Sequence, residues 1–396
     1  MSRKSFVFRF LAGVGIVTVA ALGLAGCAAV SQEDTAQPQQ PAAATKSHSQ
    51  NGDQTIVDLL EPIRQKYKVP AICAAIVNSE GLVAVGAVGL RKVDIETPVT
   101  IDDVWHLGSD TKAMTASMIG RLVEQGKLRW DSTLAEIFPE LAPTIRPELK
   151  EVTMLQLLSH WAGLDANDNW QSYSQMGTPQ QQRYEGVKKA VSEQPKYTPG
   201  SGYHYSNLGY VVAGAVIEKV TGSSWEEQIK TLLFDPLQMT TASFGGVGTL
   251  GRLDQPWGHD DNGRPVAFNG PAMDNPPVLG PAGRVHCTIQ DWAKFVIDQL
   301  KGAMEKPALL KTEAYKKIQS PPFGGDSALG WLAVQRDWGG GMVLNHCGSN
   351  TMNYANVWIA PHRDFAILVC INQGGDTAFN ATDEVVATLI SVAVKK

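Results

Sequence analysis

Hydrophobic residues recur along this chain with two different spacings, one typical of helices and one typical of strands. Apolar side chains follow helical spacing over three segments, 56–67, 112–125 and 209–220. Short apolar runs bounded by turn residues predict five strands, at 72–77, 82–88, 343–347, 354–360 and 365–371. The last two strands are separated only by a turn at 361–364, which predicts an antiparallel meander.

The order of these elements predicts the fold class. Strands at both ends with helices between them indicate an α+β fold, in which an antiparallel sheet is flanked by helices and closed by the N- and C-terminal segments. We expect an inserted, mainly helical lobe between the two sets of strands. Pro, Gly, Asn and Asp crowd residues 257–283, which predicts a long surface excursion. The folded domain is expected to cover 55–396.

The N-terminal segment predicts targeting rather than fold. Three basic residues precede an apolar run over 10–24, and the run ends in the letters L-A-G-C, with Cys27 last. This pattern predicts a secretory signal over 1–26 and resembles the bacterial lipobox, in which the cysteine is lipidated after cleavage. A plain membrane anchor is the alternative, because the run is almost long enough to span a bilayer. Residues 27–54, rich in Gln, Ala, Ser and Pro, predict a flexible tether on the outer side of the membrane.

Composition narrows the function classes. A chain of 396 residues with a net charge of −5 carries no basic footprint for nucleic acid. The sequence has no C-x-x-C or H-E-x-x-H, so we expect no dedicated metal site and no cofactor. The cysteines other than Cys27 are expected to be mostly buried, apolar residues: Cys73, Cys287, Cys347 and Cys370.

The first chemical candidate is an S-x-x-K pattern, Ser109 and Lys112, at the predicted start of a helix. Residues three apart share a helix face, so the ammonium of Lys112 can reach the hydroxyl of Ser109. A serine becomes nucleophilic when a neighbour takes its proton, and a desolvated lysine can do so. The helix N-terminus would direct backbone N–H groups at a developing oxyanion. An exposed helix cap with a solvated lysine is the structural alternative.

A Y-x-N pattern occurs twice, at 205–207 and at 354–356. The second copy lies in a predicted strand, whereas the first lies in a turn that leads into a helix, so Tyr205 and Asn207 are the candidates. Tyrosine has a reference pKa of about 10 and needs cationic neighbours to act as a base. Lys112 and His346 are the candidate cations. The alternative is a packed Tyr205 whose hydroxyl satisfies a buried carbonyl.

An H-x-G pattern also occurs twice, at 106–108 and 346–348. The first copy directly precedes Ser109 and is expected to shape the turn before it. The second copy lies on a predicted strand, where Gly348 allows a substrate backbone to approach closely. His346 is expected to neutralise an anionic leaving group or to tune Tyr205. A structural histidine is the alternative.

These motifs, in this order, resemble the serine β-lactamase and penicillin-binding-protein-like superfamily, in the branch of class C β-lactamases, DD-peptidases and esterases. The resemblance covers about 56–389, and further stretches support it: L-L-S-H-W-A-G-L at 157–164, 131–141, Gly330-Trp331 and 282–295.

The resemblance implies a role for each site residue. Ser109 would be the acylated nucleophile, Lys112 its proton partner and Tyr205 the general base and then acid. Asn207 would contact the substrate amide and His346 would close the site. The backbone N–H groups of Ser109 and Ser349 would form the oxyanion hole.

β-Lactamases of this branch usually carry K-T-G where this chain has His346-Cys347-Gly348, so a permanent charge for a substrate carboxylate is missing. H-x-G does occur in peptidase and esterase members of the branch. We therefore predict an acyl-enzyme serine hydrolase whose substrate is a β-lactam, a D-amino-acid peptide of the cell wall or a small ester. The alternatives are a slow-turnover penicillin-binding or cell-wall sensor lipoprotein, and a structural lipoprotein without catalysis. The sequence does not determine the oligomeric state.

Overall fold

The computed structural model describes residues 50–266 and 274–394. The predicted signal, Cys27 and most of the predicted tether lie outside these residues. Within the described part, no helix is both long and apolar enough to cross a membrane. Residues 50–54, which end the predicted tether, hydrogen-bond to the folded body: the N–H of Ile101 donates to Gln50 O at 3.0 Å, and that of Asp53 donates to Val85 O at 2.7 Å.

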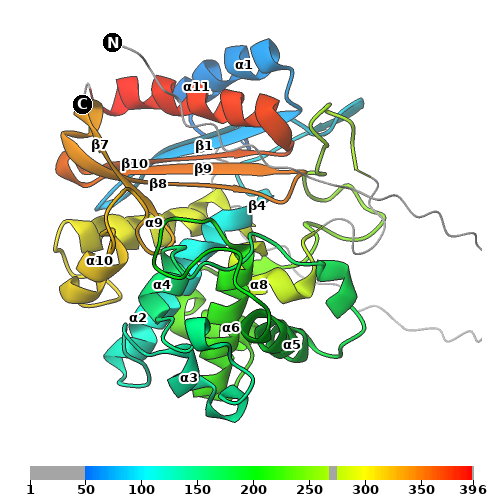
Figure 1. Cartoon of the computed structure of the whole chain (residues 1–396). Helices are drawn as coiled ribbons and strands as arrows, with labels where there is room; N and C mark the ends of the chain where they lie inside the picture. Colours follow the sequence, from blue (N-terminus) through cyan, green and yellow to red (C-terminus); the bar gives the residue numbers. More distant parts are fainter. Residues whose placement is uncertain (1–49, 267–273, 395–396) are drawn as a thin grey trace, which may run out of the picture. The chain divides into compact units, whose positions relative to one another are not determined.

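A seven-stranded antiparallel sheet lies at the centre of the fold, with the strand order β3-β2-β1-β10-β9-β8-β7 (Figure 1). Its strands are β1 (Ala71–Asn78), β2 (Gly81–Lys92), β3 (Ile95–Pro98), β7 (Leu332–Arg336), β8 (Gly341–Ser349), β9 (Tyr354–Ala360) and β10 (Phe365–Ile371). N-terminal β1 pairs with C-terminal β10, and Cys73 lies opposite Cys370. The predicted α+β class, the meander and the closure of the sheet by both ends of the chain are confirmed.

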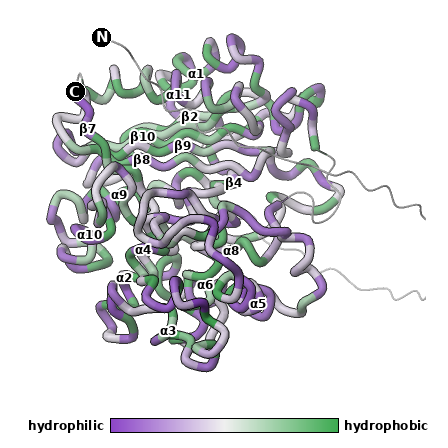
Figure 2. The backbone as a smooth tube through the Cα atoms, in the orientation of Figure 1, coloured by the Kyte–Doolittle hydropathy of each residue, from purple (hydrophilic) through white to green (hydrophobic). Residues whose placement is uncertain are grey.

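Burial on both faces explains why the central strands are continuously apolar. Every residue of β10 is buried, and so are the first seven residues of β1. Helices α1 (Gln54–Tyr67) and α11 (Gly375–Ala393) cover one face, and α9 (Ile289–Ala303) and the helical lobe cover the other (Figure 1). Figure 2 shows mainly hydrophobic central strands and outer helices with one polar side. Helix α1 matches the amphipathic segment predicted at 56–67.

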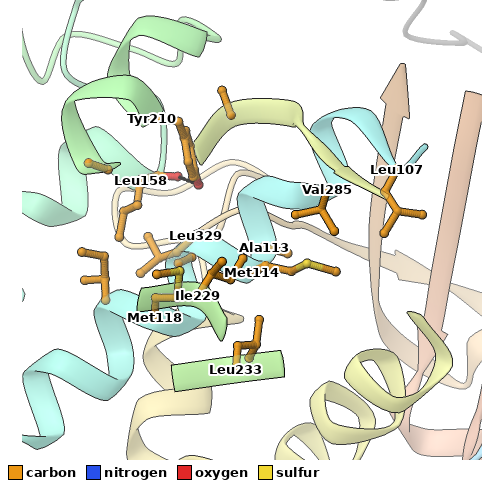
Figure 3. Close-up of a cluster of buried hydrophobic side chains, with 14 of the residues drawn as sticks. Leu107, Ala113, Met114, Met118, Leu158, Tyr210, Ile229, Leu233, Val285 and Leu329 are labelled. Atoms are coloured by element: carbon orange, nitrogen blue, oxygen red, sulfur yellow. Dashed lines mark hydrogen bonds between the residues drawn. The ribbon is translucent and has the colours of Figure 1, made fainter. Parts of the chain in front are cut away.

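The remaining helices build the lobe: α2 (Thr111–Glu124), α3 (Leu134–Ile137), α4 (Met154–Leu158), α5 (Pro179–Ser192), α6 (Asn207–Thr221), α7 (Trp225–Ile229), α8 (Gly280–Gly283) and α10 (Thr312–Ile318). Helix α2, which follows Ser109, is buried on nearly all sides. Figure 3 shows Met114 and Met118 of this helix among apolar side chains that include Leu107 and Val285. An all-round hydrophobic contact holds a helix in one position, so the chemistry at its N-terminus rests on a rigid support.

The predicted surface excursion at 257–283 is confirmed around 261–265, where every residue except the half-buried Gly263 is exposed, and is wrong for 278–283. Residues 278–283 are buried, and Pro281 packs where a Cβ at Gly214 of α6 would lie only 2.1 Å away. His259 is also fully buried (0% exposed), and its Nδ1 donates to Asn372 O at 2.7 Å. Turn-forming residues were the basis of the prediction, but turns can be buried when other segments satisfy their polar groups.

A second, small sheet holds the segment before Ser109. It has the order β4-β6-β5, with β4 (Val104–His106), β6 (Val285–Thr288) and β5 (Ser243–Phe244). The N–H of Leu107 continues this pairing by donating to Val285 O at 2.9 Å. The chain therefore enters the nucleophile turn from a fixed strand.

Candidate active site

Ser109 lies in a 3₁₀ turn, Gly108–Asp110, between β4 and α2. The turn is possible because Gly108 has φ +52°, a left-handed conformation that a residue with a side chain rarely adopts. Ser109 is only 9% exposed, and its Oγ lies within hydrogen-bond distance of two other predicted site residues. The spacing argument for Ser109 and Lys112 is thus confirmed as geometry.

Lys112 is completely buried (0% exposed), and its Nζ lies 2.9 Å from Ser109 Oγ. Nζ also donates to Ala282 O, in α8, at 2.6 Å. Burial lowers the pKa of Lys112 well below its usual value, and the nearby Asp110 only partly opposes this shift. Burial therefore favours a neutral amine with a free lone pair beside the serine hydroxyl.

Tyr205 approaches the same oxygen from the loop before α6. Its hydroxyl oxygen lies 2.8 Å from Ser109 Oγ, and Lys112 Nζ lies 5.0 Å from the centre of its ring. Burial raises the pKa of Tyr205, although the hydrogen bond with Ser109 acts in the other direction. The expectation that Lys112 and His346 lower this pKa is wrong, because desolvation outweighs any cationic influence. The resting Tyr205 is a neutral phenol.

His160, to which the sequence argument gave no role, supports Tyr205. The two rings are 4.6 Å apart between centroids, and His160 is buried. Its Nδ1 accepts the N–H of Ser206 at 3.1 Å, and its backbone oxygen accepts the N–H of His204 at 2.8 Å. These bonds attach the loop on both sides of Tyr205 to the segment 157–164. His160 is the histidine of the L-L-S-H-W-A-G-L stretch, which was the one sequence feature that could have pointed to it. Its contact with the loop around Tyr205 could not be deduced from spacing.

Asn207 is the first residue of α6 and lies on the same loop as Tyr205. Its Nδ2 donates to Asn167 Oδ1 at 2.8 Å, and its backbone N–H donates to Ala166 O at 2.8 Å. Asn167 also accepts the indole N–H of Trp170 at 3.4 Å. Asn167 is therefore a further site residue that sequence reasoning missed, because no motif marks it.

His346, on β8, is uncharged. Its Nδ1 lies 2.7 Å from Gly330 O, and since a carbonyl only accepts, this nitrogen carries the proton. Burial lowers the pKa of His346 to about 3. The ring therefore leaves Nε2 as an acceptor, and the cation expected at this position is absent at neutral pH.

Two glycines bring β8 against the nucleophile turn. A Cβ at Gly348 would lie 1.9 Å from Leu107 O and 2.7 Å from the backbone nitrogen of Ser109. A Cβ at Gly108 would lie 2.3 Å from the backbone nitrogen of Ser349. The backbone nitrogens expected to form the oxyanion hole thus lie on two segments in direct contact. Gly348 is needed for this contact between segments, a different reason from the substrate approach inferred from its sequence.

Asp110 and Cys347 lie behind this contact. Asp110 is 1% exposed, and within the described residues neither of its carboxylate oxygens has a hydrogen-bond partner. Burial raises the pKa of Asp110 well above its usual value, against the influence of Lys112. The Sγ of Cys347 lies 3.4 Å from Asn356 Oδ1. Neither side chain was assigned a catalytic role from the sequence.

The two motif copies set aside at the sequence level have other surroundings. The second Y-x-N lies in β9, as predicted, where Asn356 accepts from Asn345 Nδ2 at 3.1 Å. The first H-x-G precedes the nucleophile, and His106 Nδ1 accepts the N–H of Gly108 at 3.0 Å. The expectation that this segment shapes the turn is confirmed.

The four cysteines in the described part of the chain are free thiols. Cys73, Cys287 and Cys370 are buried, and none of the four described cysteines is paired, in agreement with the prediction of apolar core residues. Within 50–266 and 274–394, no group of three or more His, Cys, Asp or Glu residues could hold a metal ion.

Comparisons with known proteins agree with this geometry. The Beta-lactamase family model matches residues 56–390. "Penicillin-binding protein 4" of Amycolatopsis lactamdurans is 23% identical over 344 residues, covering 81% of this chain and 85% of that protein. "Protein flp" of Staphylococcus aureus is 22% identical and covers 82% of this chain, which spans only 64% of that relative's length.

Solved structures show the same fold. A class C beta lactamase from Rhodobacter sphaeroides superposes with a TM-score of 0.67 at 20% identity, covering 85% of this chain and 100% of that one. The D-alanine carboxypeptidase AmpC from Burkholderia cenocepacia gives a TM-score of 0.66 at 19% identity, covering 85% and 98%. At these identities the likeness concerns the fold alone.

Proposed function

The chain belongs to the beta-lactamase family, and from this we propose that it is a serine hydrolase that forms an acyl-enzyme at Ser109 with an uncharged carboxylic ester or amide. One observation carries the proposal. Ser109 Oγ lies 2.9 Å from a buried lysine amine and 2.8 Å from a partly buried phenol, which gives one oxygen both a proton acceptor and a proton donor.

The directions of the pKa shifts of Lys112 and Tyr205 support the following proton transfers in acylation. The neutral amine of Lys112 takes the hydroxyl proton as Ser109 Oγ forms a bond to the substrate carbonyl carbon. The backbone N–H groups of Ser109 and Ser349 stabilise the oxyanion that develops. As the carbon–oxygen or carbon–nitrogen bond to the leaving group breaks, Tyr205 gives its proton to the leaving atom. The acyl-enzyme then holds a Lys112 ammonium and a Tyr205 phenolate.

Deacylation reverses these transfers. The Tyr205 phenolate takes a proton from water, whose oxygen attacks the acyl carbon, and Ser109 Oγ leaves with the proton that Lys112 returns. Both residues thus regain their resting states, and the charge balances in each half. In this scheme Tyr205 acts first as an acid and then as a base, the reverse of the order that the family resemblance implies.

The state of His346 favours substrates without a carboxylate near the scissile bond. An anion requires a cation or N–H donors, whereas neutral His346 offers the lone pair of Nε2. We therefore place neutral esters and amides ahead of β-lactams and of peptides that end in a free D-alanine.

Labelling with a fluorophosphonate tests the nucleophile. Wild type is expected to be labelled, whereas Ser109→Ala is not, because the alkylphosphonyl group bonds to Oγ. Ser117→Ala is the matched control, since Ser117 is a buried serine of α2 whose hydroxyl donates to Ala113 O and accepts from Gln299 Nε2, away from Ser109. Retained labelling of Ser109→Ala would show that another residue is the nucleophile.

Substrate turnover tests the second part of the proposal. A short p-nitrophenyl ester, nitrocefin and a D-Ala-D-Ala peptide are compared on wild type and Ser109→Ala. We expect the highest kcat/KM for the ester. A burst of one product equivalent without turnover would instead identify the slow penicillin-binding or sensor protein.

We also propose that the protein is attached to the cell envelope through a lipid on Cys27. The support is the sequence pattern alone. A palmitate analogue supplied to expressing cells should label wild type and not Cys27→Ser. Equal labelling of both proteins would exclude Cys27 as the site.

A further inference from the structure

A second histidine network lies behind the nucleophile turn. His106 ends β4, its side chain is completely buried, and its Nε2 lies 2.6 Å from Asp274 Oδ1. The other oxygen of Asp274 accepts from Nε of Arg284 at 2.9 Å. The backbone N–H of Asn275 donates to Oδ1 at 2.6 Å. With three donors, Asp274 is a fixed acceptor in a side-chain position that is only 5% exposed.

This carboxylate determines which nitrogen of His106 carries the proton. Asp274 accepts, so the proton lies on Nε2, and Nδ1 keeps its lone pair. That lone pair accepts the N–H of Gly108 at 3.0 Å. If the proton moved to Nδ1, two N–H groups would face each other and the bond to Gly108 would be lost. In this row of two hydrogen bonds, Gly108 therefore donates to His106, and His106 donates to Asp274.

The bond ends at the peptide between residues 107 and 108, which is followed by the peptide that carries the N–H of Ser109. Gly108 has φ +52°, and the position of its Cα fixes how closely the turn approaches the backbone nitrogen of Ser349. A rotation of the 107–108 peptide would tilt the turn and, with it, the backbone N–H of Ser109. Loss of one aligned oxyanion donor typically costs ~10²–10³ in rate.

The fold does not need this bond to hold β4. Val104, Trp105 and His106 pair with β6, and the N–H of Leu107 already donates to Val285 O at 2.9 Å. The neighbouring His286, opposite His106 in the pairing, turns its Nδ1 to Gly245 O at 3.0 Å and makes no bond to the turn. The hydrogen bond from Gly108 to His106 acts on the 107–108 peptide, which lies outside the β-pairing and whose carbonyl, Leu107 O, accepts the N–H of Asp110 at 3.2 Å.

We propose that His106 and Asp274 are positioning residues that hold the Gly108 peptide, and through it the backbone N–H of Ser109, in the orientation that binds the oxyanion. This inference rests on the proposed function, since it assigns these residues to acylation of Ser109.

The experiment compares two substitutions of His106, one that keeps the hydrogen bond with Gly108 and one that keeps the hydrogen bond with Asp274. In His106→Asn the amide reaches where Nδ1 lies and can accept from Gly108, but it loses Asp274. In His106→Gln the amide reaches Asp274 and loses Gly108. The rate of fluorophosphonate labelling is the readout, with the Tm measured for each protein. His286→Gln is the matched control, a neighbouring buried histidine outside the network.

We expect labelling of His106→Gln to be ~10- to 100-fold slower than wild type, with His106→Asn and His286→Gln within ~3-fold. Asp274→Asn should also slow labelling ~10-fold, because an amide cannot accept from both His106 and Arg284. Equal rates for the Asn and Gln variants of His106 would overturn the positioning role. If His106→Gln does not fold, Asp274→Asn decides: wild-type labelling by that variant would overturn it.

These outcomes differ from failure of the proposed function. Labelling that persists in Ser109→Ala would overturn the nucleophile itself. Labelling that depends on Ser109 but is insensitive to both halves of the network would overturn only the roles of His106 and Asp274.

Discussion

The two H-x-G segments, 106–108 and 346–348, have the same pattern and hold their histidines in opposite ways. His106 donates from Nε2 to a carboxylate and accepts at Nδ1, whereas His346 donates from Nδ1 to a backbone carbonyl and keeps Nε2 as an acceptor. One ring acts on the backbone of the nucleophile turn. The other contributes an uncharged acceptor on the opposite strand.

Their glycines, in contrast, serve one purpose. Gly108 lies against the backbone of Ser349, and Gly348 lies against Leu107 O and the nitrogen of Ser109. The two segments therefore meet at their glycines, and this contact brings together the backbone nitrogens of Ser109 and Ser349, the oxyanion donors of our proposal. The glycine of each H-x-G pattern allows the two backbones to approach closely. The hydrogen-bond partner of each histidine determines which of its ring nitrogens carries the proton. The predictions below separate these two contributions.

Removing the close contact should have the largest effect. Gly348→Ala places a methyl group 1.9 Å from Leu107 O, so β8 or the turn must move. We expect labelling of Ser109 to slow at least ~100-fold and the free energy of unfolding to fall by about 3 kcal/mol. Gly108→Ala adds backbone strain at φ +52° and should behave alike.

Gly222→Ala controls for backbone strain. Gly222 has φ +74° at the end of α6, and a Cβ there meets nothing within 4 Å. It should cost about 1 kcal/mol of stability without changing the labelling rate. If Gly108→Ala and Gly222→Ala affected the rate equally, strain rather than the contact between the segments would explain the loss.

The pH dependence of labelling should report the titration of Lys112, whose Nζ lies 2.9 Å from Ser109 Oγ, rather than that of His346. Labelling needs the neutral amine, so the rate should be constant at high pH and fall tenfold per pH unit below the lowered pKa of Lys112. His346, with a pKa of about 3, stays neutral across the usual range of measurement. Stopped-flow labelling between about pH 4 and 9 measures this limb.

A variant of Asp110 tests whether its carboxylate raises the pKa of Lys112. Asp110 raises the pKa of Lys112 in opposition to burial, so Asp110→Asn should move the acidic limb to lower pH. A move to higher pH would contradict this assignment. The same profile measured for His346→Asn should keep the limb of the wild type.

Adding the missing charge to the second segment should change substrate preference. In His346→Lys the ammonium offers a carboxylate a partner that the neutral ring lacks. We expect kcat/KM for nitrocefin to rise ~10-fold relative to the p-nitrophenyl ester, a shift of ~1.4 kcal/mol between the two transition states. An unchanged ratio in a folded variant would show that His346 does not face the substrate's anionic group.

Local spacing sufficed to predict some of this site. The strands of the meander alternate or run apolar because of their burial, and Ser109 and Lys112 are three residues apart on a helical turn. Tertiary packing decided the rest. Ala282 O reaches Lys112 from 170 positions away, and nothing in the sequence around a backbone carbonyl identifies its partner.

The charge states of Tyr205 and His346 could not be predicted from the sequence for the same reason. Whether Tyr205 or His346 is charged depends on how much water is excluded, and the excluding atoms come from the whole lobe. Asn167 and Asp274 act through contacts with residues 40 and 168 positions away, so no local pattern could reveal either.

The smallest effect is expected at the middle residue of the second segment, Cys347. Threonine is the middle residue of the K-T-G pattern of the β-lactamases that this chain resembles, and it suggests a hydroxyl for the substrate. The Sγ of Cys347, however, lies 3.4 Å from Asn356 Oδ1 and 4.0 Å from Asn345 Nδ2. Asn356 is 2% exposed and also contacts Thr382 of α11, so the thiol belongs to a structural group of side chains. Cys347→Ser keeps a donor to Asn356, and Cys347→Ala removes it.

We therefore expect both variants to keep kcat/KM for the ester within ~3-fold, because the contacts of Cys347 involve neither the glycine contact nor His346. Cys347→Ala should lose about 1 kcal/mol of unfolding free energy, the typical net value of one hydrogen bond, and Cys347→Ser less. Urea denaturation measures the difference. A loss of activity in Cys347→Ala at unchanged stability would place the thiol among the substrate-binding groups, and the two H-x-G segments would then differ in all but their glycines.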